Sequence, residues 1–232
     1  MSGPRAGWLY ENKVNGAAAE QLLVLSENDW NDTMRDSIVV PVMRLTGVAP
    51  NALRISVDET PGLYAQCTLV QSIAHDGIGA PLRVCPEEAW IRTRLGVRRF
   101  LDIDRRRTSA AKPSPSPERT EWWPRQDDVH IATLPGIPQQ KVVSAISDDD
   151  WNSTASVRHC AAARLTSRGP KANRVRWEVP VSGGFVVAGD LSALPYAAIN
   201  RQAPAAKKYP QRFSADESSR IALRQQTALS LK

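Results

Sequence analysis

The side chains best suited to acid–base chemistry or metal binding are few in this 232-residue chain. They are three histidines and three cysteines: His75, His130, His159, Cys67, Cys85 and Cys160. None of them has the short paired spacing of a zinc site or of a disulfide framework. His75 is followed by an acid, Asp76, which could orient it for proton transfer. The sequence predicts no metal and no cofactor, and the unpaired cysteines favour a reducing, cytoplasmic location.

The net charge is +6, and most of the excess positive charge lies in two segments. Residues 104–120 hold five Lys or Arg against two acids, and residues 203–232 hold six against two. Flexible basic arms can neutralise the phosphates of a nucleic acid, or they can simply keep a protein soluble. The nucleic-acid interpretation gives six candidate binding residues: Arg105, Arg106, Arg107, Lys207, Lys208 and Arg212.

One motif, a serine and an acidic turn ending in Asp-Trp-Asn, occurs twice in the chain. It spans Ser26 to Asn31 and, 121 positions later, Ser147 to Asn152. About 13 residues after each Trp comes the tripeptide Arg-Leu-Thr, at 44–46 and at 164–166. Several matches in the same order and at nearly one offset predict a duplicated domain, since solenoid repeats are much shorter.

The segment between the two copies is rich in proline and serine. Pro113, Pro115 and Pro117 alternate with serine, which favours extended backbone and removes the hydrogen-bond donors that a sheet needs. We therefore expect four parts: a first domain over 5–103, a basic linker over 104–120, a second domain over 121–202 and a basic tail over 203–232.

Within each copy, the hydrophobic pattern is mainly that of strands. Strands are expected at 22–25, 37–42, 54–57, 142–146, 157–162 and 174–179. Helices are expected at 27–31, 86–95, 148–152 and 214–231. Ser26 and Ser147 are predicted to cap the two short helices, and Ser214 with Glu217 has the spacing of a capping box. The fold class is therefore mainly β with short helices (α+β).

The order of these motifs resembles that of the MazF/PemK toxin family, whose members are small SH3-like β-barrels and in many cases endoribonucleases. The matching motifs are Gly7-Trp8-Leu9-Tyr10, Leu22 to Ser26, Val39-Val40-Pro41-Val42, Leu69 to Ile73 and the helix start Pro86-Glu87-Glu88. The resemblance covers most of 5–103 and extends more weakly over 121–200. It implies two SH3-like antiparallel β-barrels that pack as a pseudo-dimer within a monomer, followed by a helical tail.

The family's catalytic pair is an Arg just before the Val-Leu-Val-Val-Ser strand and a Thr directly after the Val-Pro-Ile motif. The alignment places Glu20 and Met43 there in the first copy, and Lys141 and Ala163 in the second. Met43 and Ala163 cannot transfer a proton, and Glu20 inverts the charge that a phosphate needs. A slip of one residue in the alignment would bring in two arginines. The candidate catalytic residues are therefore Lys141, Arg44 and Arg164.

Three functions remain open from the sequence. The first is a toxin-like or regulatory protein that binds RNA, DNA or a protein without the family's catalytic pair. The second is a metal-independent endoribonuclease, an mRNA interferase. The third is a protein-interaction module, by analogy with CcdB-like relatives, with an antitoxin-like partner. The chain contains no apolar run of about 18 residues, so no membrane-spanning segment is expected.

Overall fold

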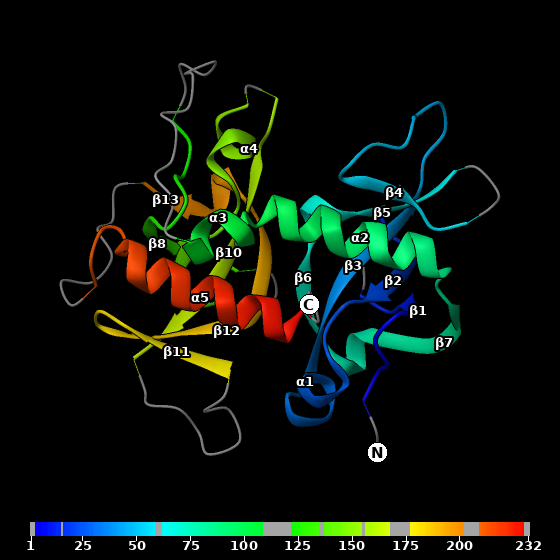
Figure 1. The fold of residues 1–232 in the computed structure, drawn as a ribbon, viewed down its shortest axis with the longest axis horizontal. Coiled ribbons are helices and arrows are strands. Elements are labelled where there is room, and N and C mark those ends of the chain that lie inside the picture. Colours follow the sequence, from blue (N-terminus) through cyan, green and yellow to red (C-terminus); the bar gives the residue numbers. More distant parts are fainter. Residues whose placement is uncertain are drawn as a thin grey trace. The chain divides into compact units, whose positions relative to one another are not determined.

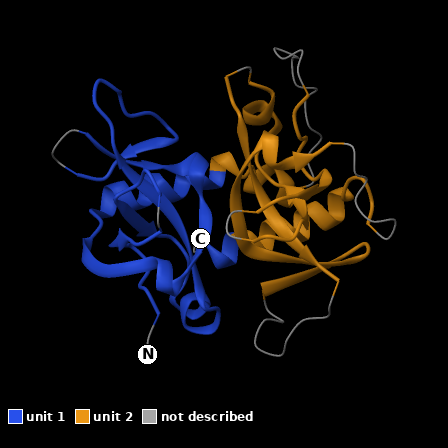
Figure 2. Cartoon of the chain, turned by 180° about the vertical axis from the view of Figure 1, so that it is seen from behind, with its two compact units in different colours: residues 1–98, 226–232 blue, residues 99–225 orange. Residues whose placement is uncertain are grey.

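The computed structural model describes residues 3–14, 16–58, 62–108, 122–134, 137–154, 156–167, 177–201 and 209–229. In these ranges the chain is mostly β, with two antiparallel sheets and a few helices (Figure 1). It divides into two compact units (Figure 2): unit 1 is 1–98 with 226–232, and unit 2 is 99–225. The expected α+β class is confirmed. No helix of the described part is long and apolar enough to cross a membrane.

Unit 1 is built on a seven-stranded antiparallel sheet with the order β4-β5-β3-β2-β1-β7, and with β6 paired to β3. Its strands are β1 (Trp8–Asn12), β2 (Gln21–Val24), β3 (Asp36–Arg44), β4 (Arg54–Ser56), β5 (Leu63–Gln66), β6 (Gln71–Ala74) and β7 (Ile78–Val84). The short helices are α1 (Asn28–Thr33), η1 (Cys67–Leu69) and η2 (His75–Gly77), and α2 (Glu87–Phe100) follows β7.

Unit 2 is built on a six-stranded antiparallel sheet with the order β11-β12-β10-β9-β8-β13. Its strands are β8 (Val129–Ala132), β9 (Lys141–Ala145), β10 (His159–Thr166), β11 (Glu178–Val181), β12 (Gly184–Pro195) and β13 (Ile199–Asn200). Its helices are α3 (Ile103–Thr108), α4 (Asp149–Ser153), η4 (Tyr196–Ala198) and most of α5 (Ala215–Ala228).

Neither sheet closes on itself within the described residues. The end strands β4 and β7 are not paired with each other in the unit-1 sheet, and neither are β11 and β13 in the unit-2 sheet. The closed barrels that the sequence led us to expect are therefore not found. Each sheet buries one apolar cluster, which includes Leu22, Val24 and Val39 in unit 1 and Val143 and Ala162 in unit 2.

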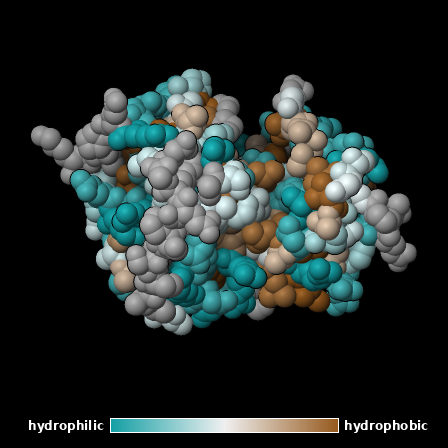
Figure 3. Space-filling model, turned by 90° about the horizontal axis from the view of Figure 1, so that it is seen from above, coloured by the Kyte–Doolittle hydropathy of each residue, from teal (hydrophilic) through white to brown (hydrophobic). Residues whose placement is uncertain are grey.

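Exposed large apolar side chains occur in unit 1. They are Trp8, Val14, Leu82, Val84, Ile91 and Leu95. Trp8 and Val84 are directly opposite each other on β1 and β7. The face drawn in Figure 3 shows brown hydrophobic residues between teal hydrophilic ones. Trp8 and Val84 thus place two neighbouring apolar side chains on the surface of unit 1.

The serine of the first motif does not cap its helix. Glu27 occupies the N-cap position of α1, and Ser26 is buried. The Ser26 hydroxyl donates to Oδ1 of Asn31 at 2.5 Å and accepts from the Ile38 amide at 2.9 Å. The prediction of a serine cap is thus wrong, because this hydroxyl joins the short helix to the next strand.

The second motif has the same arrangement in unit 2. Asp148 is the N-cap of α4. The buried Ser147 hydroxyl donates to Oδ1 of Asn152 at 2.7 Å and accepts from the Ala161 amide at 3.1 Å. The serine hydroxyl thus forms hydrogen bonds both with the asparagine five residues later and with a backbone amide of the next strand. This requirement accounts for the recurrence of both residues at this spacing.

The expected linker begins with ordered structure. Helix α3 covers Ile103–Thr108, and both Ile103 and Arg106 are buried in it. Residues 104–108 are therefore helical, whereas the proline-rich stretch that follows lies outside the described residues.

Helix α5 starts with the expected capping box. The Ser214 amide and hydroxyl both donate to the Glu217 carboxylate at 2.9 Å, and the Glu217 amide donates back to the Ser214 hydroxyl at 3.3 Å. The same carboxylate accepts from the Ser182 amide at 2.6 Å. Burial alone would raise the pKa of Glu217, but these hydrogen bonds outweigh it and lower the pKa to about 2.

This carboxylate should make the stability of unit 2 pH-dependent. Because the folded-state pKa lies below the usual 4.5, the ionised form stabilises the fold above about pH 4.5 and this contribution is lost as the pH falls towards 2. The shift corresponds to at most about 3 kcal/mol. Urea unfolding from pH 6 to pH 3 should show a smaller loss of stability in Glu217→Gln than in the wild type. Asp216→Asn, which alters an exposed neighbour, is the control; equal pH slopes in all three proteins would contradict the assignment.

Candidate functional site

The hydrogen-bonded registers show which positions of the two units correspond. Leu22 of β2 is opposite Pro41 of β3, and Val143 of β9 is opposite Arg164 of β10. Leu22 and Val143 are 121 positions apart, whereas their partners are 123 apart. The connection into β10 is therefore two residues longer than the connection into β3, which a gap-free alignment of the motif does not show.

This register changes which residue of unit 2 occupies the position that the resemblance assigns to a threonine. Met43 is opposite Tyr64, and Thr166 is opposite Phe185. Tyr64 and Phe185 are again 121 positions apart. Thr166 is therefore the counterpart of Met43 in unit 2, and the assignment of that position to Ala163 is corrected.

Lys141 and Thr166 lie at the same end of the unit-2 sheet. Lys141 is the first residue of β9, and Thr166 is the last residue of β10. The last pair between β9 and β10 is Val143 opposite Arg164, and Lys141 and Thr166 each lie two positions beyond it. A cation and a hydroxyl are thus located at the same end of the unit-2 sheet.

The two arginines of the sequence prediction have different surroundings. Arg164 shares the face of Lys141 but forms an ion pair with Asp190, with side-chain exposures of 30% and 18%. Arg44 is exposed at the end of β3 in unit 1. By register Arg44 is not the counterpart of Arg164, so the repeated Arg-Leu-Thr does not mark one structural position. Lys141 and Arg164 lie on the same face of the unit-2 sheet, whereas Arg44 belongs to unit 1.

The predicted nucleic-acid residues of α3 are mostly engaged within the protein. Arg106 is 3% exposed and hydrogen-bonded on all three nitrogens. Arg105 donates to Asp102 and Asp148, both at 2.7 Å. Only Arg107 of the three is exposed, and therefore open to a phosphate.

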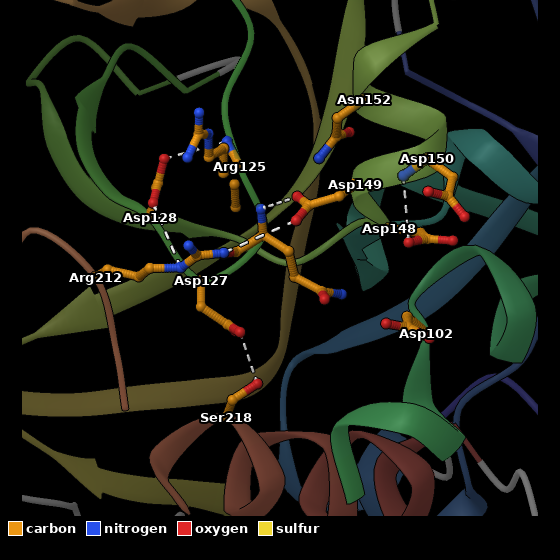
Figure 4. A network of polar contacts seen from close by, with 12 residues as sticks. Asp102, Arg125, Asp127, Asp128, Asp148, Asp149, Asp150, Asn152, Arg212 and Ser218 are labelled. Carbon is orange, nitrogen blue, oxygen red and sulfur yellow. Dashed lines mark hydrogen bonds and ion pairs between the residues drawn. The ribbon is translucent and has the colours of Figure 1, made fainter. Parts of the chain in front are cut away.

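Arg212 belongs to a polar network of unit 2 (Figure 4). Its guanidinium lies 3.8 Å from both Asp128 and Asp149 and donates to the Gln126 carbonyl at 2.9 Å. Burial raises the pKa of Asp128, an effect that the hydrogen bond from the Arg125 amide partly offsets. Arg212 therefore neutralises one buried acid, Asp149, and one partly exposed acid, Asp128. Two further predicted residues, Lys207 and Lys208, lie outside the described residues.

No metal site emerges from the acids, histidines and cysteines of the described ranges. The three cysteines are buried and unpaired, and burial raises the pKa of Cys67 and Cys160 to about 12 and of Cys85 to about 11. Thiols with such pKa values are not nucleophiles at neutral pH.

Unit 1 contains a cavity of about 1010 Å³ near its N-terminal segment. It is lined by Gly3, Pro4, Arg5, Tyr10, Asn31, Asp32, Arg35, His75, Asp76, Ile78, Gly79 and Pro81. These residues come from the N-terminal segment, β1, the end of α1 and the turn after it, η2 and β7. We call this cavity the unit-1 pocket.

The rim of the unit-1 pocket is held by the N-terminal segment. The Nδ2 group of the buried Asn31 side chain donates to the Pro4 carbonyl at 2.7 Å, and the Arg5 backbone amide donates to the Tyr10 hydroxyl at 2.8 Å. The Gly3 amide donates to Asp32 at 2.8 Å. A Cβ at Gly3 would lie 2.6 Å from the Asn31 carbonyl oxygen, so this close approach requires glycine. The pocket is therefore largely preformed.

His75 contributes a neutral imidazole to the unit-1 pocket. Its Nε2 lies 3.2 Å from the hydroxyl of the buried Ser37. Burial lowers the pKa of His75 below its usual 6.5, although the Asp36 backbone and the carboxylates of Asp32 and Asp76 act in the opposite direction. A neutral ring at pH 7 can donate or accept a hydrogen bond but adds no charge.

The corresponding place in unit 2 is filled. The His75 amide donates to the Arg35 carbonyl at 3.1 Å, and the Tyr196 amide donates to the Arg158 carbonyl at 2.9 Å. His75 and Tyr196 are therefore counterparts, again 121 positions apart. Tyr196 is buried in the apolar cluster of unit 2.

Aromatic rings occupy the space around Tyr196. The Trp122 ring lies edge-on to Tyr196 at 6.5 Å and to His130 at 5.6 Å between centroids. The Tyr196 hydroxyl donates to the Asn152 carbonyl at 3.0 Å. Burial lowers the pKa of His130, as expected for a ring packed among aromatic side chains. Unit 2 has apolar packing where unit 1 has a polar pocket.

Sequence reasoning missed the unit-1 pocket as a site. The sequence predicts a candidate proton-transfer role for His75 beside Asp76, but it does not connect Arg5 and Arg35 with them. The four residues come from three separate segments, and no local spacing joins them.

No protein-family model and no curated protein sequence matches this chain. Among solved structures, the chain is similar to an endoribonuclease from Mycobacterial species, with 16% identity and a TM-score of 0.36 over 42% of this chain and 90% of that one. It is also similar to an endoribonuclease in complex with its cognate antitoxin from Mycobacterial species, with 15% identity and a TM-score of 0.36 over 41% of this chain and 91% of that one. Each of these likenesses covers less than half of the chain.

Proposed function

We propose that this protein is a toxin-like protein that acts on single-stranded RNA and cleaves it without a metal ion. The observation that carries this proposal is the position of Lys141 and Thr166 at the same end of the unit-2 sheet, at the start of β9 and the end of β10. These residues stand at the two positions where the MazF/PemK resemblance calls for a cation and a threonine. Unit 1 has Glu20 and Met43 there, so the activity belongs to unit 2.

The chemistry fits these two side chains. In metal-free cleavage, the ribose 2′-hydroxyl attacks the adjacent phosphorus and the bond to the 5′-oxygen breaks, while the hydroxyl proton passes to water. The Lys141 ammonium stabilises the charge that develops on the phosphoryl oxygens and can protonate the departing oxygen. The Thr166 hydroxyl donates a hydrogen bond to the same phosphate. Arg164 is already paired with Asp190, and we do not assign it a contact with the phosphate.

The proposal includes two diverged copies of one domain. Support comes from the matching strand orders and from the identical Ser–Asn hydrogen bonds, which join Ser26 to Asn31 and Ser147 to Asn152. On this view each copy descends from an SH3-like domain, and the chain is a monomer with an internal pseudo-dimer. Light scattering should then give the mass of one chain.

The test is incubation of single-stranded RNA with the purified chain in the presence of EDTA. Discrete fragments ending in a 2′,3′-cyclic phosphate are expected, and double-stranded DNA should remain intact. Intact RNA after prolonged incubation at micromolar protein would rule out cleavage.

A second candidate function is binding of a protein partner of the antitoxin kind. The exposed apolar residues of unit 1, among them Trp8, Val84 and Leu95, favour it. This function does not require Lys141. A partner that binds Lys141→Ala as tightly as the wild type, with no RNA fragments in either case, would favour binding over catalysis.

A further inference from the structure

The unit-1 pocket has the size and the side chains of a ligand site. Its volume of about 1010 Å³ is at the upper end of the range for small-molecule sites, roughly 300–1,000 Å³. Its lining combines polar and charged side chains with the apolar residues Ile78 and Pro81. Unit 2 serves as an internal comparison, since the same place there is filled by Trp122 and Tyr196.

The charges in the pocket favour an anion with one phosphate. Arg35 is exposed, and none of the described carboxylates forms an ion pair with its guanidinium. Arg5 forms a long ion pair of 3.4 Å with Asp32, and both side chains are more than 40% exposed. Such a pair contributes little and can open to a competing anion. Two guanidinium groups are thus available in the pocket. A guanidinium is planar and can donate two parallel hydrogen bonds to one phosphate.

The side chains of the pocket can balance only one phosphate. Asp32 and Asp76 offset the two arginines, and His75 is neutral, so the side chains of the pocket carry no net charge. The carboxylates and the imidazole are suited to accept hydrogen bonds from sugar hydroxyls or base amino groups. The ligand class is therefore a single phosphate attached to a hydroxyl-bearing, partly apolar body.

We propose that the unit-1 pocket binds one ribonucleotide, with its phosphate on Arg35 and Arg5 and its sugar and base against Asp76, His75 and Pro81. The ribonucleotide is either a free monophosphate or the phosphorylated end of an RNA strand. This site is separate from the strand end of unit 2 that carries Lys141, and it does not depend on cleavage.

The test is calorimetric titration of the full chain with uridine 5′-monophosphate, uridine and inorganic phosphate, and with a ten-nucleotide RNA with or without a 5′-phosphate. The monophosphate should bind at least tenfold more tightly than uridine. Arg35→Gln should weaken its binding at least tenfold, since a charge-assisted bidentate contact is lost. Arg44→Gln, an exposed arginine of the same unit outside the pocket, should bind like the wild type.

A second variant, His75→Tyr, introduces the residue that fills this place in unit 2 and should abolish binding by occupying the pocket. Binding of the phosphorylated RNA alone, lost in Arg35→Gln, would identify the strand end as the ligand. Equal affinity for uridine and its monophosphate would overturn the proposal, as would unchanged binding in both variants. Lys141→Ala should leave the affinities for uridine 5′-monophosphate and inorganic phosphate unchanged, so failure here is distinguishable from failure of the cleavage proposal.

Discussion

Replacing Lys141 by alanine is expected to lower the rate of RNA cleavage in EDTA by about 10²–10³-fold. This is the usual loss when one group that stabilises charge in the transition state is removed. The ammonium is the cation proposed to face the phosphate at this end of the unit-2 sheet, because Arg164 on the same face is already paired with Asp190. Initial rates on a fluorescent single-stranded RNA measure the effect.

Two control variants show whether the loss of rate depends on the positive charge at position 141. Lys141→Arg keeps the charge and should retain most of the activity. Arg44→Ala removes an exposed arginine from unit 1 and should leave the rate unchanged. If Lys141→Ala cleaves RNA at the wild-type rate, the cleavage does not depend on Lys141.

The largest expected effect on stability comes from Arg106. Its guanidinium donates to Ser218 at 3.0 Å, to Gln225 at 2.8 Å and to Asp127 at 3.2 Å, and its side chain is 1% exposed. Arg106→Met would leave the Asp127 carboxylate buried without its cation. Removing one partner of a buried ion pair costs about 3–5 kcal/mol. The free energy of unfolding of unit 2, from urea unfolding and from amide exchange over 215–225, should fall by that amount.

Arg107→Met is the matched control, since Arg107 is the exposed neighbour on the same helix. Its effect should stay within about 0.5 kcal/mol. A loss below about 1 kcal/mol in Arg106→Met would mean that the network contributes little net stability. The buried position of Arg106 already argues against its predicted role in binding nucleic acid.

Much of the fold followed from local sequence patterns. The apolar runs at 22–25 and 142–146 coincide with β2 and β9 to within one residue at each end. The Ser214–Glu217 spacing correctly predicted the start of α5, because a capping box is a local arrangement. The closed barrels were not predicted correctly, since closure depends on pairing between distant strands.

The candidate sites were harder to predict because they depend on register and on distant segments. Two extra residues before β10 make Thr166 the counterpart of Met43, whereas the alignment with the family motif places Ala163 there. A strand's register is fixed by cross-strand hydrogen bonds, which a motif alignment does not contain. The unit-1 pocket likewise joins Arg5, Arg35 and His75 across most of unit 1.

The most direct test of the proposed function is a double-mutant cycle on Lys141 and Thr166. Cleavage rates in EDTA are measured for the wild type, Lys141→Ala, Thr166→Val and the double variant. Residues that act together on one phosphate give strongly non-additive effects, so the double variant should be hardly slower than the slower single one. Independent effects that multiply in the double variant, or no effect of Thr166→Val, would contradict a shared site at this end of the sheet.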